Sequence, residues 1–325
     1  MLAGVKHEIS VSKLFTLQLG AEWNHILGKI PEYNNGKAEE DSFDFTASFQ
    51  KNIKDRLALV LNFRQPVVKG FAAPFLPYLG AEYFLLKSSK QDFSIRGNAS
   101  KNYRVPTLND RYWHSAGSTT LLPETSYAAE AGWLWRIRRF KIENTWFKQD
   151  IDQWIQWIPR EDGQYIPRNV KQVRAQGFEV RLSSEEKISS VTITPVLSYQ
   201  FTKSVTTDAP PAEQFTIGKQ LIYTPVHTAI SYVKVNWTDY FFTLGAQYSG
   251  KRYVDFSNSE IYALPEYTLI NFSGGRSWRI KQHQITINLA VNNIFNVDYQ
   301  QYSGRAMPGR NYNFKLIYQL NHKNE

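Results

Sequence analysis

The closing segment Asn311-Tyr-Asn-Phe-Lys-Leu-Ile-Tyr-Gln-Leu320 decides the fold class, because its side chains alternate between apolar and polar. One face carries Tyr312, Phe314, Leu316, Tyr318 and Leu320. The other face carries Asn311, Asn313, Lys315 and Gln319, with Ile317 as the single apolar exception. A period of two predicts a β-strand with one apolar and one polar face. Soluble sheets and transmembrane barrels share this pattern, so the number of strands and the lengths of their connections must decide between them.

The same alternation recurs along the chain, for example at Phe15, Leu17 and Leu19. Counting such windows predicts about fifteen strands. They cover residues 2–10, 13–26, 43–51, 55–65, 79–87, 91–101, 125–137, 140–149, 170–183, 188–202, 221–236, 239–251, 266–279, 283–293 and 310–320. Because turn residues separate them, we expect an all-β antiparallel meander.

The predicted connections alternate in length along the chain. Short ones lie at 10–13, 51–55, 87–91, 137–140, 183–188, 237–239 and 279–282, and long ones at 27–42, 66–78, 102–124, 150–169, 203–220, 252–265 and 294–309. Outer-membrane barrels have short periplasmic turns and long extracellular loops. Trp135, Trp237 and Trp278 lie beside short turns and Trp23 near a long loop, as two aromatic girdles require, although each also suits an ordinary core. These features favour an antiparallel transmembrane β-barrel segment.

Composition narrows the function classes. The chain has 325 residues, no cysteine, 15% aromatic residues and a net charge of +9. The Lys and Arg residues are scattered singly, which disfavours nucleic-acid binding. The absence of cysteine excludes disulfides and thiolate metal sites. No window approaches the roughly eighteen apolar residues of a membrane-spanning helix. No catalytic motif occurs, so we predict neither an enzyme nor a metal site.

The strand count also predicts how the sheet is bounded. The last strand follows a long loop and ends on the short-turn side. Because successive strands run in opposite directions, an odd number of about fifteen strands places the start of the first strand on the long-loop side. Residues 1–30 lack the features of a signal peptide. We therefore expect residues 1–325 to be one partial barrel domain, incomplete at its N-terminal side and without a plug. Such a sheet forms either a C-shaped barrel or a strained parallel seam.

Several separated motifs make up a recognisable set. Tyr103-Arg104-Val-Pro106 precedes Asn109-Asp110, and Leu122-Pro123-Glu124 and Glu130-Ala-Gly132 follow. The two prolines stop strands at a long loop, whose base an Arg104–Glu124 ion pair would tie, with solvated charges as the alternative. Further on come Val173-Arg-Ala-Gln-Gly177-Phe-Glu179, where a parity switch predicts a bulge at Gly177, then Asn292-Asn293-Ile-Phe-Asn296 and Pro308-Gly309-Arg310.

This set resembles TonB-dependent outer-membrane receptors over roughly the last 230 residues, and looks most like the vitamin B12 receptor subgroup of Bacteroidetes type. The chain departs from the family at Gly117-Ser-Thr-Thr120. The resemblance implies a place in the Gram-negative outer membrane, in contact with its lipid, and energised uptake of an extracellular ligand: cobalamin, a ferric siderophore or haem. It implies contact with the TonB complex only through the plug, and no resident cofactor, since haem or a corrinoid would be cargo.

The loops supply candidate ligand residues, namely Tyr112, Trp113, His114, Trp154 and Trp157. His114 occupies the place where haem receptors of the family carry an axial histidine, although an exposed loop histidine is the simpler interpretation. The aromatic residues suit a ligand platform or cross-strand packing equally. Two alternatives of other classes stay open: a passive porin-like channel, and a soluble β-rich adhesin or carbohydrate-binding module.

Overall fold

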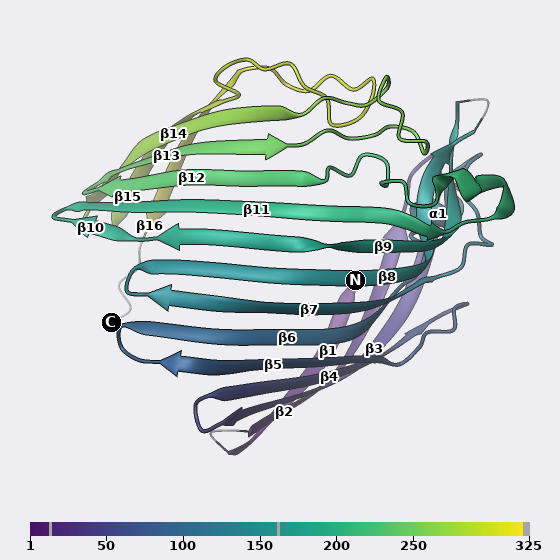
Figure 1. Cartoon of the computed structure of the whole chain (residues 1–325), viewed down its shortest axis with the longest axis horizontal. Helices are drawn as coiled ribbons and strands as arrows, with labels where there is room; N and C mark the ends of the chain where they lie inside the picture. Colours follow the sequence, from purple (N-terminus) through teal and green to yellow (C-terminus); the bar gives the residue numbers. More distant parts are fainter. Residues whose placement is uncertain (13–14, 161–162, 321–325) are drawn as a thin grey trace.

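A computed structural model describes residues 1–12, 15–160 and 163–320, and over these residues the chain forms one antiparallel sheet of 16 strands. Figure 1 shows the sheet curving into an incomplete barrel. The strands are β1 (Leu2–Ser12), β2 (Phe15–Gly28), β3 (Ala38–Ile53), β4 (Leu57–Val68), β5 (Leu76–Lys87), β6 (Gln91–Arg104), β7 (Glu124–Ile137), β8 (Phe140–Pro159), β9 (Tyr165–Ser184), β10 (Glu186–Ile188), β11 (Val191–Asp208), β12 (His227–Trp237), β13 (Tyr240–Ser249), β14 (Tyr267–Ile280), β15 (His283–Asn292) and β16 (Asn311–Leu320). The helical elements are α1 (Leu108–Tyr112) and the 3-10 turn η1 (Pro211–Thr216).

Neighbours in the sheet follow the order of the chain, apart from the short strand β10, which pairs with β11 at the side. Within the described residues β1 pairs only with β2 and β16 only with β15, so the barrel is open. The predicted all-β, antiparallel fold is confirmed, and of the two expected outcomes the sheet takes the C-shaped one.

Tight hairpins make the short connections. Arg138, Ser189, Thr238 and Lys281 have positive φ angles of 52°, 55°, 51° and 54°. Two-residue hairpins prefer such turns because their twist matches that of the flanking strands. The predicted turn at 10–13 ends at residue 13, which lies outside the described part of the chain. No helix in the described ranges is long and apolar enough to cross a membrane.

The predicted long loop at 150–169 is wrong. β8 and β9 continue through most of it, with Trp154 opposite Val170 and Ile158 opposite Ile166. Aromatic and β-branched side chains favour such cross-strand pairs, and the strand pairing continues far beyond the sheet's other strand ends. Trp154 and Trp157 therefore belong to a long hairpin and not to an irregular loop.

Three smaller expectations also fail. The predicted turn at 183–188 contains the short strand β10. The predicted strand at 221–236 begins only at His227, because Tyr223 has a φ of 57° and Pro225 lacks an N–H group. No bulge occurs at Gly177, where pairing with Phe147 and Thr202 runs without a shift. Glycine is required there for space, because a Cβ would lie 1.8 Å from the Phe201 carbonyl oxygen.

The register assigns every strand an apolar and a polar face. Phe314 lies opposite Leu289, which is followed across the sheet by Gly274, Phe242 and Val235. The same pairing places Trp23, Trp135, Trp237 and Trp278 on this apolar face. Phe314 is 66% exposed and Trp237 51%, so these side chains have no core to enter. The buried hydrophobic cluster is small: Ile151, Val170, Val173 and Leu221, with Trp154 packed against it.

Candidate functional site

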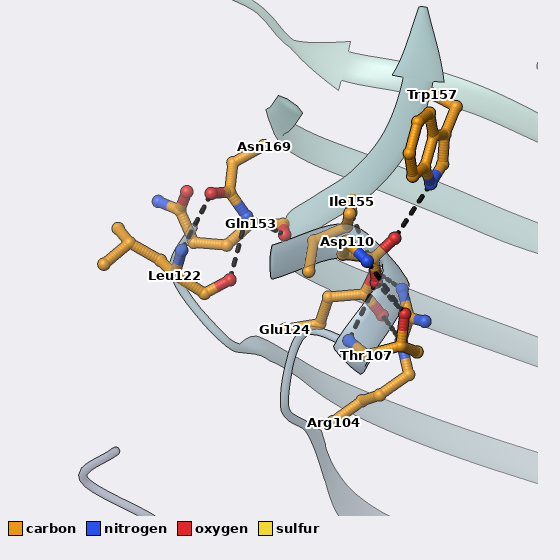
Figure 2. Close-up of polar contacts among 9 residues, drawn as sticks. All are labelled: Arg104, Thr107, Asp110, Leu122, Glu124, Gln153, Ile155, Trp157 and Asn169. Carbon is orange, nitrogen blue, oxygen red and sulfur yellow. Dashed lines mark hydrogen bonds and ion pairs between the residues drawn. The ribbon is translucent and has the colours of Figure 1, made fainter. Parts of the chain in front are cut away.

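The loop between β6 and β7 is held at its base by one buried carboxylate, shown in Figure 2. The Nε atom of Arg104 donates to Oε2 of Glu124 at 2.8 Å, and Nη2 donates to Oε1. The backbone N–H of Ile155 also donates to Oε1, at 2.7 Å. The predicted Arg104–Glu124 pair is thus present, and it anchors β8 as well. Pro106, the next motif residue, is fully buried.

Asp110 closes the first turn of α1 and connects it to the β8–β9 hairpin. The Thr107 N–H donates to Asp110 Oδ2 at 2.8 Å, and the Asp110 N–H donates back to Thr107 Oγ1 at 3.2 Å. This reciprocal capping box satisfies two free N–H groups at the helix start. The second oxygen, Oδ1, accepts from Trp157 Nε1 at 2.8 Å (Figure 2). One carboxylate therefore fixes both α1 and the indole.

The far end of the loop is tied down by Asn169 of β9. Its Oδ1 accepts from the Leu122 N–H at 2.9 Å, while its Nδ2 donates to the carbonyls of Leu122 at 2.9 Å and Gln153 at 2.7 Å. Gln153 has a φ of 58°, which turns its carbonyl out of the β8 ladder. The chain at Pro123, directly before β7, is therefore held in a fixed position.

The other side of α1 is supported by β3 and the loop before it. Arg111 Nη2 donates to Glu40 Oε2, and the two side chains are only 8% and 11% exposed. The guanidinium also lies 5.4 Å from the centre of the Phe71 ring. The Tyr33 hydroxyl donates to Asn109 Oδ1 at 2.6 Å. Buried, hydrogen-bonded charges of this kind specify one arrangement because an unpaired partner would be costly.

Beside α1 lies a cavity of about 530 Å³ that is open to the outside. Its lining consists of Thr107, Asn109, Asp110, Trp113, Ser115, Ala116, Trp157, Gln164 and Tyr165. Three aromatic residues thus face a set of hydroxyl and amide groups. Among the described residues the lining includes no Lys or Arg, and the Asp110 carboxylate is already bound by its neighbours.

The five candidate ligand residues lie in different surroundings. Trp113 and Trp157 line the cavity. The Tyr112 ring packs on the Arg111 guanidinium, with 5.1 Å between their centres. His114 is exposed and lies outside the cavity lining. Its backbone N–H donates to the Glu32 carbonyl at 2.5 Å. Trp154 packs on the hydrophobic cluster.

The remaining motif residues lie away from this cavity. Glu130 accepts from Asn98 Nδ2 at 2.9 Å on the polar face of β7, and Glu179 occupies the same face of β9 beside Arg96 and Arg181. Asn293 exchanges two 2.8 Å hydrogen bonds with the backbone of Val297.

Arg310 contributes its backbone N–H to Asn296 Oδ1 at 2.8 Å. Asn293 and Asn296 have positive φ angles of 51° and 52°. The Asn-Asn-Ile-Phe-Asn motif therefore joins the two ends of the β15–β16 loop at 293–310.

Sequence reasoning missed Tyr33, Glu40 and Tyr165 of the site, and it gave Asn109 and Asn169 no role of their own. Each is a single polar or aromatic residue far from its partner in sequence, as with Tyr33 and Asn109, which are 76 positions apart. The capping box Thr107-Leu-Asn-Asp110 was the one local signal available.

A family model described as "TonB dependent receptor-like, beta-barrel" matches residues 6–294. The chain belongs to this family of TonB-dependent receptor barrels. Among curated proteins it is 27% identical over 219 residues to the vitamin B12 transporter BtuB of Photobacterium profundum, covering 64% of this chain and 32% of that protein. It is 25% identical over 200 residues to BtuB of Vibrio vulnificus, covering 61% and 29%. The chain thus spans about a third of the length of these relatives.

Solved receptors of the family share the fold. The ferric enterobactin receptor PfeA of Pseudomonas aeruginosa matches with a TM-score of 0.70 and 15% identity, covering 98% of this chain and 53% of that one. The siderophore receptor PiuA of Acinetobacter baumannii matches with a TM-score of 0.70 and 15% identity, covering 98% and 55%. These relatives are transporters and receptors, and proteins of this family lie in the outer membrane of Gram-negative bacteria and act on small molecules with TonB.

Proposed function

We propose that residues 1–325 form the barrel part of an outer-membrane receptor for energised uptake of a scarce ligand, and that this ligand is a corrinoid such as cobalamin. The observation that supports the choice of ligand is the lining of the cavity beside α1, where two tryptophans and a tyrosine face hydroxyl and amide groups and the described lining residues include no Lys or Arg.

The charge of the lining favours one ligand class over the others. A ferric catecholate siderophore bears net negative charge and needs Arg or Lys donors for tight binding. Haem needs an axial ligand, and His114 lies outside the cavity lining. A corrinoid presents a broad apolar ring edged with neutral amides, which match aromatic faces and the side chains of Asn109 and Gln164. A cavity of about 530 Å³ holds the edge of such a ligand.

The porin alternative has less support. Long loops of a passive channel need no buried ties, whereas the loop that carries α1 is held at its base by Glu124, and α1 itself is fixed by Asp110 and the Arg111–Glu40 pair. A loop that is already ordered before the ligand binds suits ligand capture, because little conformational entropy is lost on binding. The soluble module is disfavoured by the exposed apolar face of the sheet.

The test is ligand binding by cells that express the gene at its own locus. Labelled cyanocobalamin should bind, and Trp157→Phe, which removes the indole N–H but keeps a ring, should weaken binding about tenfold. Trp237→Phe is the matched control, since Trp237 lies at the opposite end of the strands. Binding of ferric enterobactin in place of cyanocobalamin would refute the corrinoid assignment.

A further inference from the structure

The short strand β10 leaves one backbone edge of the sheet open. Within the described residues β10 pairs with β11 alone, through Glu186, Lys187 and Ile188. The strand on its other side is β8, but β8 begins at Phe140, opposite Ser184 of β9. The β10–β11 hairpin therefore projects beyond the β7–β8 turn, as the left of Figure 1 shows. A projecting strand edge of this kind can accept a further strand.

The hairpin geometry determines which backbone groups are free at this edge. A two-residue turn joins Ile188 to Val191, so these two residues form the hydrogen-bonded pair that closes the hairpin. Hydrogen-bonded and non-hydrogen-bonded pairs alternate along an antiparallel ladder, and the N–H and C=O groups of Lys187 consequently point away from β11. On the same edge, the Glu185 N–H donates to the Arg139 carbonyl at 3.4 Å. This contact occupies the edge at Glu185 and leaves Lys187 free.

Beside the free edge lies a cleft of about 690 Å³. We define the turn cleft by its lining, which consists of Lys90, Gln91, Ile137, Arg138, Arg139, Phe140 and Glu186. Its two hairpin turns are held side by side, because the Arg138 N–H donates to the Lys90 carbonyl at 2.8 Å. The turn cleft thus brings cations from two hairpins next to β10.

The turn cleft and the edge carry an excess of positive charge. Their cations are Lys90, Arg138, Arg139 and Lys187, and their carboxylates are Glu185 and Glu186. Arg139 Nη1 pairs with Glu186 Oε2 at 2.6 Å. Within the described residues Lys90, Arg138 and Lys187 form no ion pair, and all three are exposed. A lysine on a strand edge discourages the addition of apolar strands. The charge therefore selects an acidic strand.

We propose that the turn cleft and the free edge of β10 bind an extended acidic peptide, which adds one strand beside β10 and places its carboxylates at Lys90, Arg138 and Lys187. In this mode of recognition main-chain hydrogen bonds supply affinity and side-chain contacts supply selectivity. An anionic lipid headgroup accounts for the cations but gives no reason for the free backbone groups.

The location of the edge indicates the kind of partner. Short turns of an outer-membrane barrel face the periplasm, so the peptide would be an acidic segment of a periplasmic protein. The inference uses the membrane orientation of the proposed function, and it does not depend on the ligand that the loops capture.

The experiment measures peptide binding to the purified full chain in neutral detergent micelles. The probe is fluorescein-labelled hexaglutamate, and hexaglutamine is the uncharged comparison, which should bind at least tenfold more weakly. Each exposed ion pair contributes up to about fivefold in affinity, so the double variant Lys90→Gln/Arg138→Gln should bind hexaglutamate about tenfold more weakly. The matched control is Lys54→Gln/Lys281→Gln, which changes two lysines in other tight turns and should bind as the wild type does.

A second set of measurements tests the added strand. Hexaglutamate with every amide N-methylated keeps its charge but has no donor for the edge, so it should bind about fivefold more weakly. Lys187→Gln removes the charge alone, whereas Lys187→Pro also removes the free N–H, so the proline variant should bind more weakly than the glutamine variant. Far-ultraviolet circular dichroism confirms that each variant is folded.

Two results would overturn the proposal. One is wild-type affinity in the Lys90→Gln/Arg138→Gln variant. The other is equal affinity for the plain and N-methylated peptides, because the cations would then bind an anion such as inorganic phosphate or a lipid headgroup without an added strand. The turn cleft lies at the end of the sheet opposite to α1 (Figure 1), so neither result affects the cyanocobalamin test and the two proposals fail separately.

Discussion

At the scale of single residues, the loop base depends on a few buried polar side chains that each hold several partners. Glu124 binds Arg104 and the Ile155 N–H, Asp110 binds Thr107 and Trp157, and Asn169 binds Leu122 and Gln153. A short loop segment has little apolar surface to bury. Its order therefore comes from hydrogen bonds whose loss would leave buried groups unpaired.

Glu124→Ala should destabilise the folded chain by about 1–3 kcal/mol, because it leaves the buried Ile155 N–H without an acceptor. Arg104→Ala should cost about 1 kcal/mol or less, since the Arg104 side chain is 47% exposed and its charge is screened. Chemical unfolding in micelles gives both values. If the arginine variant proves the more damaging, the carboxylate is not the centre of this network.

Asp255, in the loop between β13 and β14, makes a pH-dependent contact. Burial raises the pKa of its carboxyl, but the Ser257 hydroxyl and the N–H groups of Ser257 and Ser259 outweigh burial and bring the pKa below its usual 3.8. A carboxyl with a lowered folded pKa stabilises the fold above the unfolded pKa and loses this effect as pH falls through the folded value. The Ser257 and Ser259 amides should therefore lose hydrogen-exchange protection as the pH falls below 3.8 and through the lower pKa of the folded state. Asp255→Asn should remove this pH dependence, and an unchanged profile in that variant would contradict the assignment.

At the scale of secondary-structure elements, alternation along each strand determines what the strand can face. In β16, Tyr312, Phe314 and Leu316 are 71%, 66% and 60% exposed, so they need a covering of lipid. Asn313 and Lys315 lie on the polar face between them. A one-residue slip would reverse the two faces, which is why register is well specified here.

Leu316→Arg should cost roughly 2–4 kcal/mol of folding free energy in a bilayer if Leu316 lies near the midplane. Asn313→Arg adds the same side chain to the polar face and should be tolerated. Heat-modifiable mobility of the two variants after assembly into lipid vesicles provides the comparison. Assembly of Leu316→Arg at the wild-type yield would contradict the lipid-facing assignment.

At the scale of the whole molecule, the connections sort to two ends of the sheet. α1 and the β8–β9 hairpin lie at one end, at the right of Figure 1, and tight hairpins such as the one at Arg138 lie at the other. In an outer-membrane barrel the long loops face the outside of the cell.

Asn35→Cys, between β2 and β3, should therefore react with a membrane-impermeant thiol reagent on intact cells. Lys54→Cys, in the tight turn after β3, should react only after the cells are opened. The chain has no cysteine of its own, so the labelling is specific. The reverse pattern would invert the orientation and with it the proposed place of the ligand cavity.

The sequence alone determined the features that depend on local pattern. A period of two in side-chain polarity predicted each long strand, and turn residues predicted the alternation of short and long connections, apart from the loop expected at 150–169. The Arg104–Glu124 pair was also predictable, since prolines on either side of one loop bring strand ends together. Local sterics and alternation set these features before any distant contact forms.

The tertiary structure decided what depends on residues that meet across the sheet. The extended β8–β9 hairpin and the Tyr33–Asn109 and Arg111–Glu40 contacts all join residues from separate elements. Lys90, Arg138 and Glu186 look like scattered charges in the sequence, and only the pairing of the strands brings them together around one cleft. The reason is physical: alternation tells which face a side chain takes, whereas its neighbours on that face depend on strand pairing between distant parts of the chain.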